Sequence, residues 1–241
     1  MHAAILVEER SAQKDLDGFL ANWDRQYKAV MSKIDLFDQQ KTAQWTQEQK
    51  QLFIKLLYHQ RAHFDDVLWF MGNCAPTREA KEIILNNIRD ELGMNGFSHE
   101  MLYLEFAKSF GVDLTYELLE EKYYYPFLKE YNQGHLRWLR DHDWSHRLSA
   151  FAAIERLDNL DYLALKELAV NIGAKSSALI FFNVHIYVKH YEETEPAFLK
   201  LWEEQSAIIE KVFGFIGDYQ LAIWKRISDA IFKGCYLPTN S

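Results

Sequence analysis

The sequence predicts an all-α protein, and three observations lead to that class. Apolar residues recur at helical spacing along most of the 241 residues. Only 10 glycines and 4 prolines interrupt the chain, which favours long helices over many hairpins. The one β-rich run, residues 180–188, is embedded in a segment of helical length. We therefore expect one helical domain over residues 1–241, a bundle of about seven to nine helices with its core in residues 12–235.

The helices of the first third follow from apolar periodicity and from cap residues. Residues 12–36 carry apolar side chains at helical spacing. Thr46 is the expected N-cap of a long helix over residues 47–71. Pro76 and Thr77 start the next helix, which ends near Glu91. The third of these helices would place the carboxylate of Glu91 at the end of its apolar face.

Two glycines break the chain directly after Glu91. Gly93 and Gly96 interrupt the apolar pattern, and a second amphipathic run opens at Ser98 with His99 in its first turn. On one continuous helix, Glu91 and His99 would lie about 80° out of line, because each residue turns the helix by roughly 100°. The glycine break removes this restriction, so the imidazole can approach the carboxylate.

The second half of the chain is also predicted to be helical. One helix ends near His142, and further helices are expected over residues 144–157, 158–172, 178–193 and 196–232. We find no internal repeat and no linker rich in glycine and serine. One all-helical domain is therefore the simplest organisation.

Composition excludes several classes of partner. The formal net charge of −8 is spread along the chain without a basic stripe, which argues against nucleic acid and anionic membranes. The two cysteines, Cys74 and Cys235, are too few for a disulfide framework. Neither a signal peptide nor an apolar run of membrane-spanning length is visible. We expect a cytoplasmic protein that binds a small molecule, either as a single chain or as a homodimer.

Four ionisable residues stand on apolar helix faces, where burial without a partner is costly. They are Glu91, His99, Glu155 and His185. Each alone has an ordinary explanation, such as a solvated cap for a glutamate or a satisfied core position for a histidine. Together they come from four helical segments, and one metal site would relieve all four burial costs. Helical bundles build carboxylate-bridged metal sites from Glu and His in this way.

The segment after His185 adds two further candidates. Lys189 and Glu192 follow at i+4 and i+7 and therefore share the face of His185, whereas His190 points away. Glu192 is a candidate metal ligand. Lys189 would repel an ion unless a carboxylate or a bound substrate anion neutralises it, and our hypothesis is that it pairs with a substrate carboxylate near the metal.

The order of these residues resembles the haem-oxygenase-like di-iron oxidases and oxygenases. That family has a Glu, a nearby His before a Phe-x-x-x-x-Gly segment, a later Glu, and then a His-x-x-x-Asp-x-x-His helix. Glu91 and His99 correspond to the first two positions, and residues 106–111 match the segment between Phe and Gly. Glu155 and His185 occupy the later positions at the spacing that the family shows.

The resemblance covers roughly residues 50–230 and carries expectations about chemistry. It implies two Fe(II) ions, with O2 as co-substrate, held by the four residues above and by Asp65 as an additional carboxylate. Lys189 and Glu192 replace the Asp and the second His of the last motif. The second ion is therefore expected to be weakly held. Members act on amino-acid or fatty-acid derivatives, and the expected activity here is tailoring of an amino-acid-derived substrate in secondary metabolism by C–C cleavage, N-oxygenation or nitrile formation. The many aromatic residues of the chain would also suit an aromatic substrate.

Two alternatives stay open at this point. One is a cofactor-independent enzyme of the same fold, similar to the enzyme that completes pyrroloquinoline quinone or to the thiaminase-like hydrolases. The departures at Lys189 and Glu192 favour it, and the four retained candidate ligands argue against it. The other alternative is a non-catalytic binding protein on the same scaffold.

Overall fold

The computed structural model describes residues 2–94, 96–187 and 190–234, and these residues form helices joined by turns, with no β-strand among them. The all-α prediction is confirmed. Eleven α-helices and two 3-10 helices are present in this part of the chain, and nine of the α-helices have at least eight residues. None of the helices in the described residues combines the length and the apolarity needed to cross a membrane.

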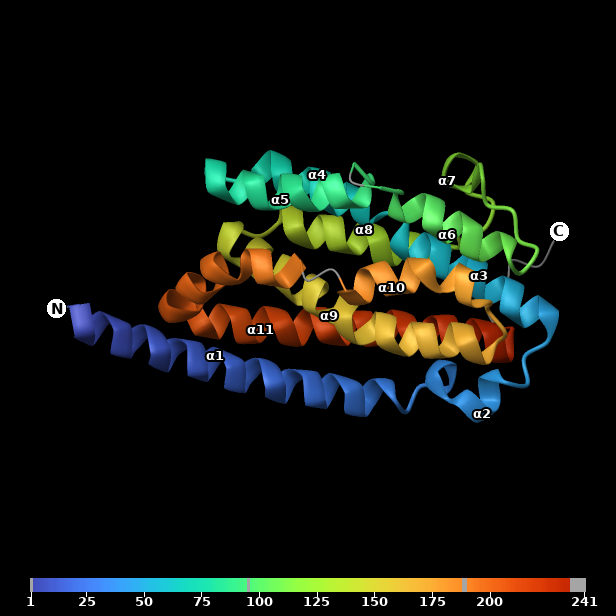
Figure 1. Ribbon diagram of the computed structural model, residues 1–241, viewed down its shortest axis with the longest axis horizontal. Helices are drawn as coiled ribbons and strands as arrows, with labels where there is room; N and C mark the ends of the chain where they lie inside the picture. The colour runs from blue at the N-terminus through green and yellow to red at the C-terminus, as the bar shows by residue number, and fades with distance from the viewer. Residues whose placement is uncertain (1, 95, 188–189, 235–241) are drawn as a thin grey trace.

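The nine longer helices carry the architecture (Figure 1). They are α1 (His2–Met31), α3 (Gln47–Arg61), α4 (Phe64–Cys74), α5 (Arg78–Glu91), α6 (His99–Lys108), α8 (Pro126–Arg140), α9 (Trp144–Asn171), α10 (Ile180–Tyr187) and α11 (His190–Lys233). The short segments are η1 (Asp35–Phe37), α2 (Gln39–Thr42), α7 (Glu117–Glu120) and η2 (Ser176–Leu179).

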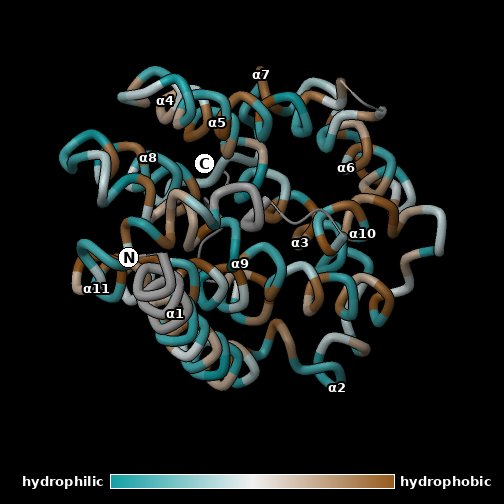
Figure 2. The backbone as a smooth tube through the Cα atoms, turned by 60° about the vertical axis from the view of Figure 1, so that its left-hand side comes forward, coloured by the Kyte–Doolittle hydropathy of each residue, from teal (hydrophilic) through white to brown (hydrophobic). Residues whose placement is uncertain are grey.

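The two longest inner helices, α9 and α11, pack along each other and form the centre of the bundle. Helix α1 lies along the outer side of α11, and α10 packs on α9 (Figures 1 and 2). Helices α4 and α5 pair on the far side of the molecule from α1 (Figure 1). This arrangement brings the ends of α5, α6 and α10 to one region, although they are separated by nearly one hundred residues of chain.

A fully buried carboxylate joins the three longest helices. Asp161 of α9 accepts hydrogen bonds from the Tyr27 hydroxyl of α1 (2.8 Å) and from two α11 donors. These are the Gln220 amide at 2.9 Å and the Trp224 indole at 3.0 Å. No cation is among these partners, and burial raises the pKa of Asp161 to about 7.

The first helices differ from the sequence prediction in their ends. Helix α1 ends at Met31 rather than near residue 36. The predicted helix over residues 47–71 is wrong, because the chain breaks between α3 and α4 at Ala62 and His63. Neither residue is a helix breaker, so no local signal marks this turn. It places Asp65 in the first turn of α4, away from the line of α3.

The helices of the second half also differ from the prediction. The helices predicted over residues 144–157 and 158–172 are one continuous helix, α9, and Asp158 lies in its interior. The predicted helix over residues 178–193 begins with the 3-10 turn η2, and its later part falls in α10 and in the start of α11. The last helix begins before Pro196 and bends at Gln205, whose φ and ψ are −149° and 43°.

Candidate metal centre

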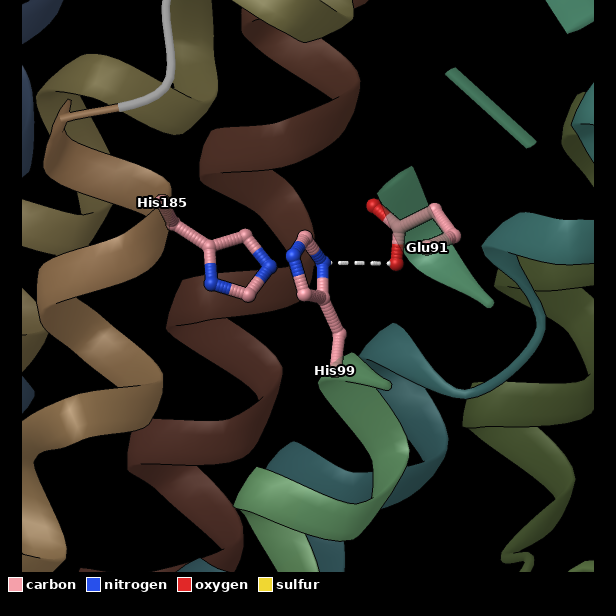
Figure 3. A group of neighbouring side chains, drawn as sticks. All are labelled: Glu91, His99 and His185. Atoms are coloured by element: carbon pink, nitrogen blue, oxygen red, sulfur yellow. Dashed lines mark ion pairs between the residues drawn. The ribbon is translucent and has the colours of Figure 1, made fainter. Parts of the chain in front are cut away.

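Three of the predicted ligands converge in the structure. Glu91 at the end of α5, His99 in the first turn of α6 and His185 on α10 offer ligand atoms that all lie within 4.8 Å of one another. Figure 3 shows the three side chains pointing toward a common point between the helices. The described residues contain no other group of His, Cys, Asp and Glu side chains this close together.

The glycine break after Glu91 is present and explains the approach. Gly93 has φ of +70°, and a Cβ atom there would lie 2.2 Å from the backbone nitrogen of Ser98. Only glycine fits this tight turn. Ser98 then caps α6, because its hydroxyl accepts from the backbone N–H of Met101 at 3.2 Å. The turn therefore sets His99 beside the carboxylate at the end of the preceding helix.

The contact between these two residues is an ion pair whose separation also suits two ligands of one cation. The Nδ1 atom of His99 lies 2.8 Å from Oε2 of Glu91, yet it has no hydrogen-bond partner in the described chain. Two ligands bound to one ion at roughly 2.1 Å each lie about 3 Å apart when they are at right angles. The observed separation is close to that value. The chemistry of the set, one carboxylate and two imidazoles, suits iron.

His185 is held in the orientation that a ligand needs. Its Nδ1 atom lies 2.7 Å from the carbonyl oxygen of Phe181, so the proton on this nitrogen is donated to the backbone. The Nε2 atom then carries the lone pair for a metal ion. Its ring stacks on Tyr162, with the ring centres 3.9 Å apart and the planes 11° apart. The backbone and Tyr162 therefore fix both the tautomer and the plane of this imidazole.

The three residues lie on the wall of a cavity of about 230 Å³. Its aromatic lining comes from five helices and consists of Tyr58, Phe64, Tyr103, Tyr162 and Phe181. Its volume lies below the several hundred Å³ typical of sites for drug-sized ligands. A small substrate of the size of one amino acid fits this pocket better than a large cofactor.

The other predicted ligands lie outside the group of three. Asp65 lines the same cavity, and burial, followed by the charges of Glu91 and Glu100, raises its pKa to about 6. Glu155 is buried on α9 with 2% of its surface exposed, but it neither joins the group nor lines the cavity. A ligand role for Asp65 or Glu155 stays a prediction.

The two candidates of the last motif cannot be placed. Lys189 lies outside the described residues. Glu192 belongs to the first turn of α11, where the structure describes the backbone but not the side chains. The predicted roles of Lys189 with a substrate anion and of Glu192 with an ion therefore remain predictions.

Arg61 and Tyr162 are among the residues of the pocket wall that sequence reasoning missed. Arg61 forms a bidentate ion pair with Asp158 of α9, at 2.9 and 2.6 Å, and its guanidinium lies 4.9 Å over the ring of Tyr162. Arg61 stands four residues after the buried Leu57, so a cation on an apolar face was the available signal. Tyr162 offered no signal, because in sequence it looks like any core aromatic.

The fold and the site define a class of protein: an all-helical scaffold that holds a carboxylate and two imidazoles around one point. A family model described as iron-containing redox enzyme matches residues 51–206, and the chain belongs to this family, which has the haem-oxygenase-like fold. The matched range contains Glu91, His99 and His185. No curated protein matches the chain significantly. The protein is thus an iron-containing oxidoreductase.

Proposed function

We propose that this enzyme is an iron- and O2-dependent oxidase or oxygenase that acts on a small amino-acid-derived substrate. The convergence of Glu91, His99 and His185 at the wall of an aromatic pocket is the observation that carries the proposal. Bound iron would supply the activation of O2 that no side chain of this chain can provide. The two-ion stoichiometry with a weak second ion, and a place in secondary metabolism, are part of the proposal.

The residues of the chain would prepare the site for this chemistry. Glu91 offers a negative charge to the ion, and the two imidazoles offer neutral nitrogen ligands, so that one Fe(II) keeps a net positive charge for binding anionic partners. The Phe181 carbonyl and the Tyr162 ring hold His185 in place before any ion arrives. The aromatic lining limits water in the pocket and offers an apolar surface to the substrate.

The charges of the pocket favour a substrate with an ammonium group. Asp65, Glu91 and Glu100 line it, whereas Arg61 is the only arginine or lysine among the described lining residues. The guanidinium of Arg61 is engaged by Asp158. After Glu91 binds the ion, Asp65 remains as a carboxylate whose pKa is raised first by burial and then by the charges of Glu91 and Glu100, so a nearby positive charge would stabilise its ionised form. A substrate ammonium would supply that charge.

Anaerobic loading with Fe(II) tests the proposed activity. We expect one tightly bound ion per chain and a second, weaker one, together with O2 uptake that increases when L-phenylalanine, L-tyrosine or another amino acid is added. The bound iron is counted after removal of free metal, and O2 uptake is followed with an electrode. A protein that binds no iron specifically would contradict the proposal and favour the cofactor-independent or non-catalytic alternative.

Replacement of Asp65 by asparagine is expected to weaken amino-acid binding about 10-fold or more, because a charge-assisted contact contributes about 1.5 to 3 kcal/mol. The iron count is expected to stay the same. Binding of L-phenylalanine and of 3-phenylpropanoate, which lacks the amine, is compared by calorimetry in the iron-loaded wild type and variant. Only the amine-containing ligand should lose affinity. Loss of one iron with unchanged amino-acid affinity would instead assign Asp65 to the second ion, as the sequence predicts.

A further inference from the structure

A second and smaller cavity lies behind the metal pocket. It has a volume of about 30 Å³, and its walls come from α3, α4, α8, α9 and α11. Arg61 and Phe64 line both cavities, so the stretch of chain at the turn from α3 to α4 separates them. The cavity contains none of the candidate iron ligands.

Three polar side chains on the wall of this cavity have a buried atom without a hydrogen-bond partner in the described chain. They are Oε1 of Gln60, Nε2 of His63 and Nε2 of His135. Gln60 and His135 are almost completely buried, with 5% and 9% of their surfaces exposed. Each unsatisfied buried polar atom costs about 1–3 kcal/mol, and three in one place are rare in a folded protein. Their convergence indicates a polar guest.

The charges around the cavity favour a neutral guest that donates hydrogen bonds. The two charged residues of the wall, Arg61 and Asp158, neutralise each other in their bidentate pair. Burial lowers the pKa of His135 to about 4, so this ring is neutral at pH 7. The Nδ1 atom of His63 faces the Asp66 carboxylate at 3.4 Å, and in the tautomer that donates from Nδ1 to this carboxylate the Nε2 atom is an acceptor. The amide oxygen of Gln60 is also an acceptor.

We propose that this cavity is a binding site for two ordered water molecules that bridge Gln60, His63 and His135. One water needs roughly 10–15 Å³ of such volume and two to four polar partners, so the cavity has room for about two. The two waters would donate hydrogen bonds to Oε1 of Gln60 and Nε2 of His63, and they would exchange hydrogen bonds with each other and with His135. The binding of these waters requires neither bound iron nor the proposed reaction.

The bridge has a structural consequence for the metal pocket. Gln60 lies in the last turn of α3 and His63 directly before α4, whereas His135 belongs to α8. Two waters between them tie the turn from α3 to α4 against α8. This turn leads directly into Asp65, so the hydrated cavity holds in place one wall of the pocket where the substrate would bind.

A high-resolution crystal structure tests the site directly. We expect two water peaks within about 2.7–3.2 Å of Gln60 Oε1, His63 Nε2 and His135 Nε2. In solution, oxygen-17 relaxation dispersion counts waters of long residence time. The count should fall by two in His135→Phe, which fills the cavity with an apolar ring, and stay unchanged in His142→Phe, a matched change beyond the end of α8.

Gln60→Met serves as a second variant in case His135→Phe does not fold. It keeps the length of the side chain, removes one acceptor and should lower the count by at least one water. A wild-type crystal structure with no density between the three side chains would overturn the proposal. An unchanged count in both cavity variants would do the same.

Discussion

Replacement of His185 by alanine is expected to lower the affinity for Fe(II) by at least about 100-fold. The variant removes one of three converging ligands and leaves only Glu91 and His99, a pair too small to hold a divalent ion tightly. Loss of residues that merely orient a ligand already costs 10- to 100-fold in metal affinity, so loss of a ligand should cost more. The position on α10 also makes this a test of the long-range contact between α10 and the end of α5.

Anaerobic titration with Fe(II), repeated with Co(II) for its visible spectrum, measures the affinity. His146→Ala is the matched control, because this partly exposed histidine pairs with Asp143 at the start of α9. It should bind the ions as the wild type does, and circular dichroism should show helical content unchanged in both variants. Wild-type affinity in His185→Ala would remove this histidine from the metal centre.

Replacement of Asp161 by asparagine is expected to reduce the free energy of unfolding by about 3 kcal/mol at pH 5. The Asp161 carboxyl accepts from Tyr27, Gln220 and Trp224, which belong to α1 and α11. At pH 5 both oxygens of the protonated carboxyl can still accept, whereas an asparagine keeps one acceptor oxygen and turns toward the donors an NH2 group that cannot accept. Each buried donor left without an acceptor costs about 1–3 kcal/mol.

The effect of this substitution depends on pH in a defined direction. The pKa of Asp161 is raised to about 7 by burial, so from about pH 4 to 7 the unfolded chain releases a proton that the folded protein retains. The stability contribution of this group is therefore full at low pH, falls as pH rises through this window, and is constant above it. Between pH 5 and 7 the loss is about 3 kcal/mol, because each pKa unit corresponds to about 1.4 kcal/mol.

Asparagine does not titrate, so the variant escapes this loss. The free energy of unfolding of the variant is therefore expected to fall furthest below that of the wild type at pH 5 and to be close to it at pH 8. Urea unfolding of both proteins at the two pH values measures the difference. Asp15→Asn changes an exposed carboxylate on α1 and should show no such trend. A deficit of the same size at both pH values would show that Asp161 is ionised throughout.

The sequence by itself determined the features that depend on neighbouring residues. The helical class follows from apolar spacing. The cap predicted at Thr46 and the helix starts predicted at Thr77 and Ser98 are confirmed. The requirement for glycine at position 93 is also local, because the backbone atoms that a Cβ would meet belong to Phe97 and Ser98. These signals were sufficient to set Glu91 and His99 side by side.

The tertiary structure alone decided which distant residues share the pocket. The break after Arg61 and the unbroken course of α9 through Asp158 have no local signal, and these two side chains meet across 97 residues of chain. Burial of such a pair is favourable only when both helices are in place. The same reason applies to the stacking of Tyr162 on His185, since a contact between separate helices leaves no periodic pattern in either one.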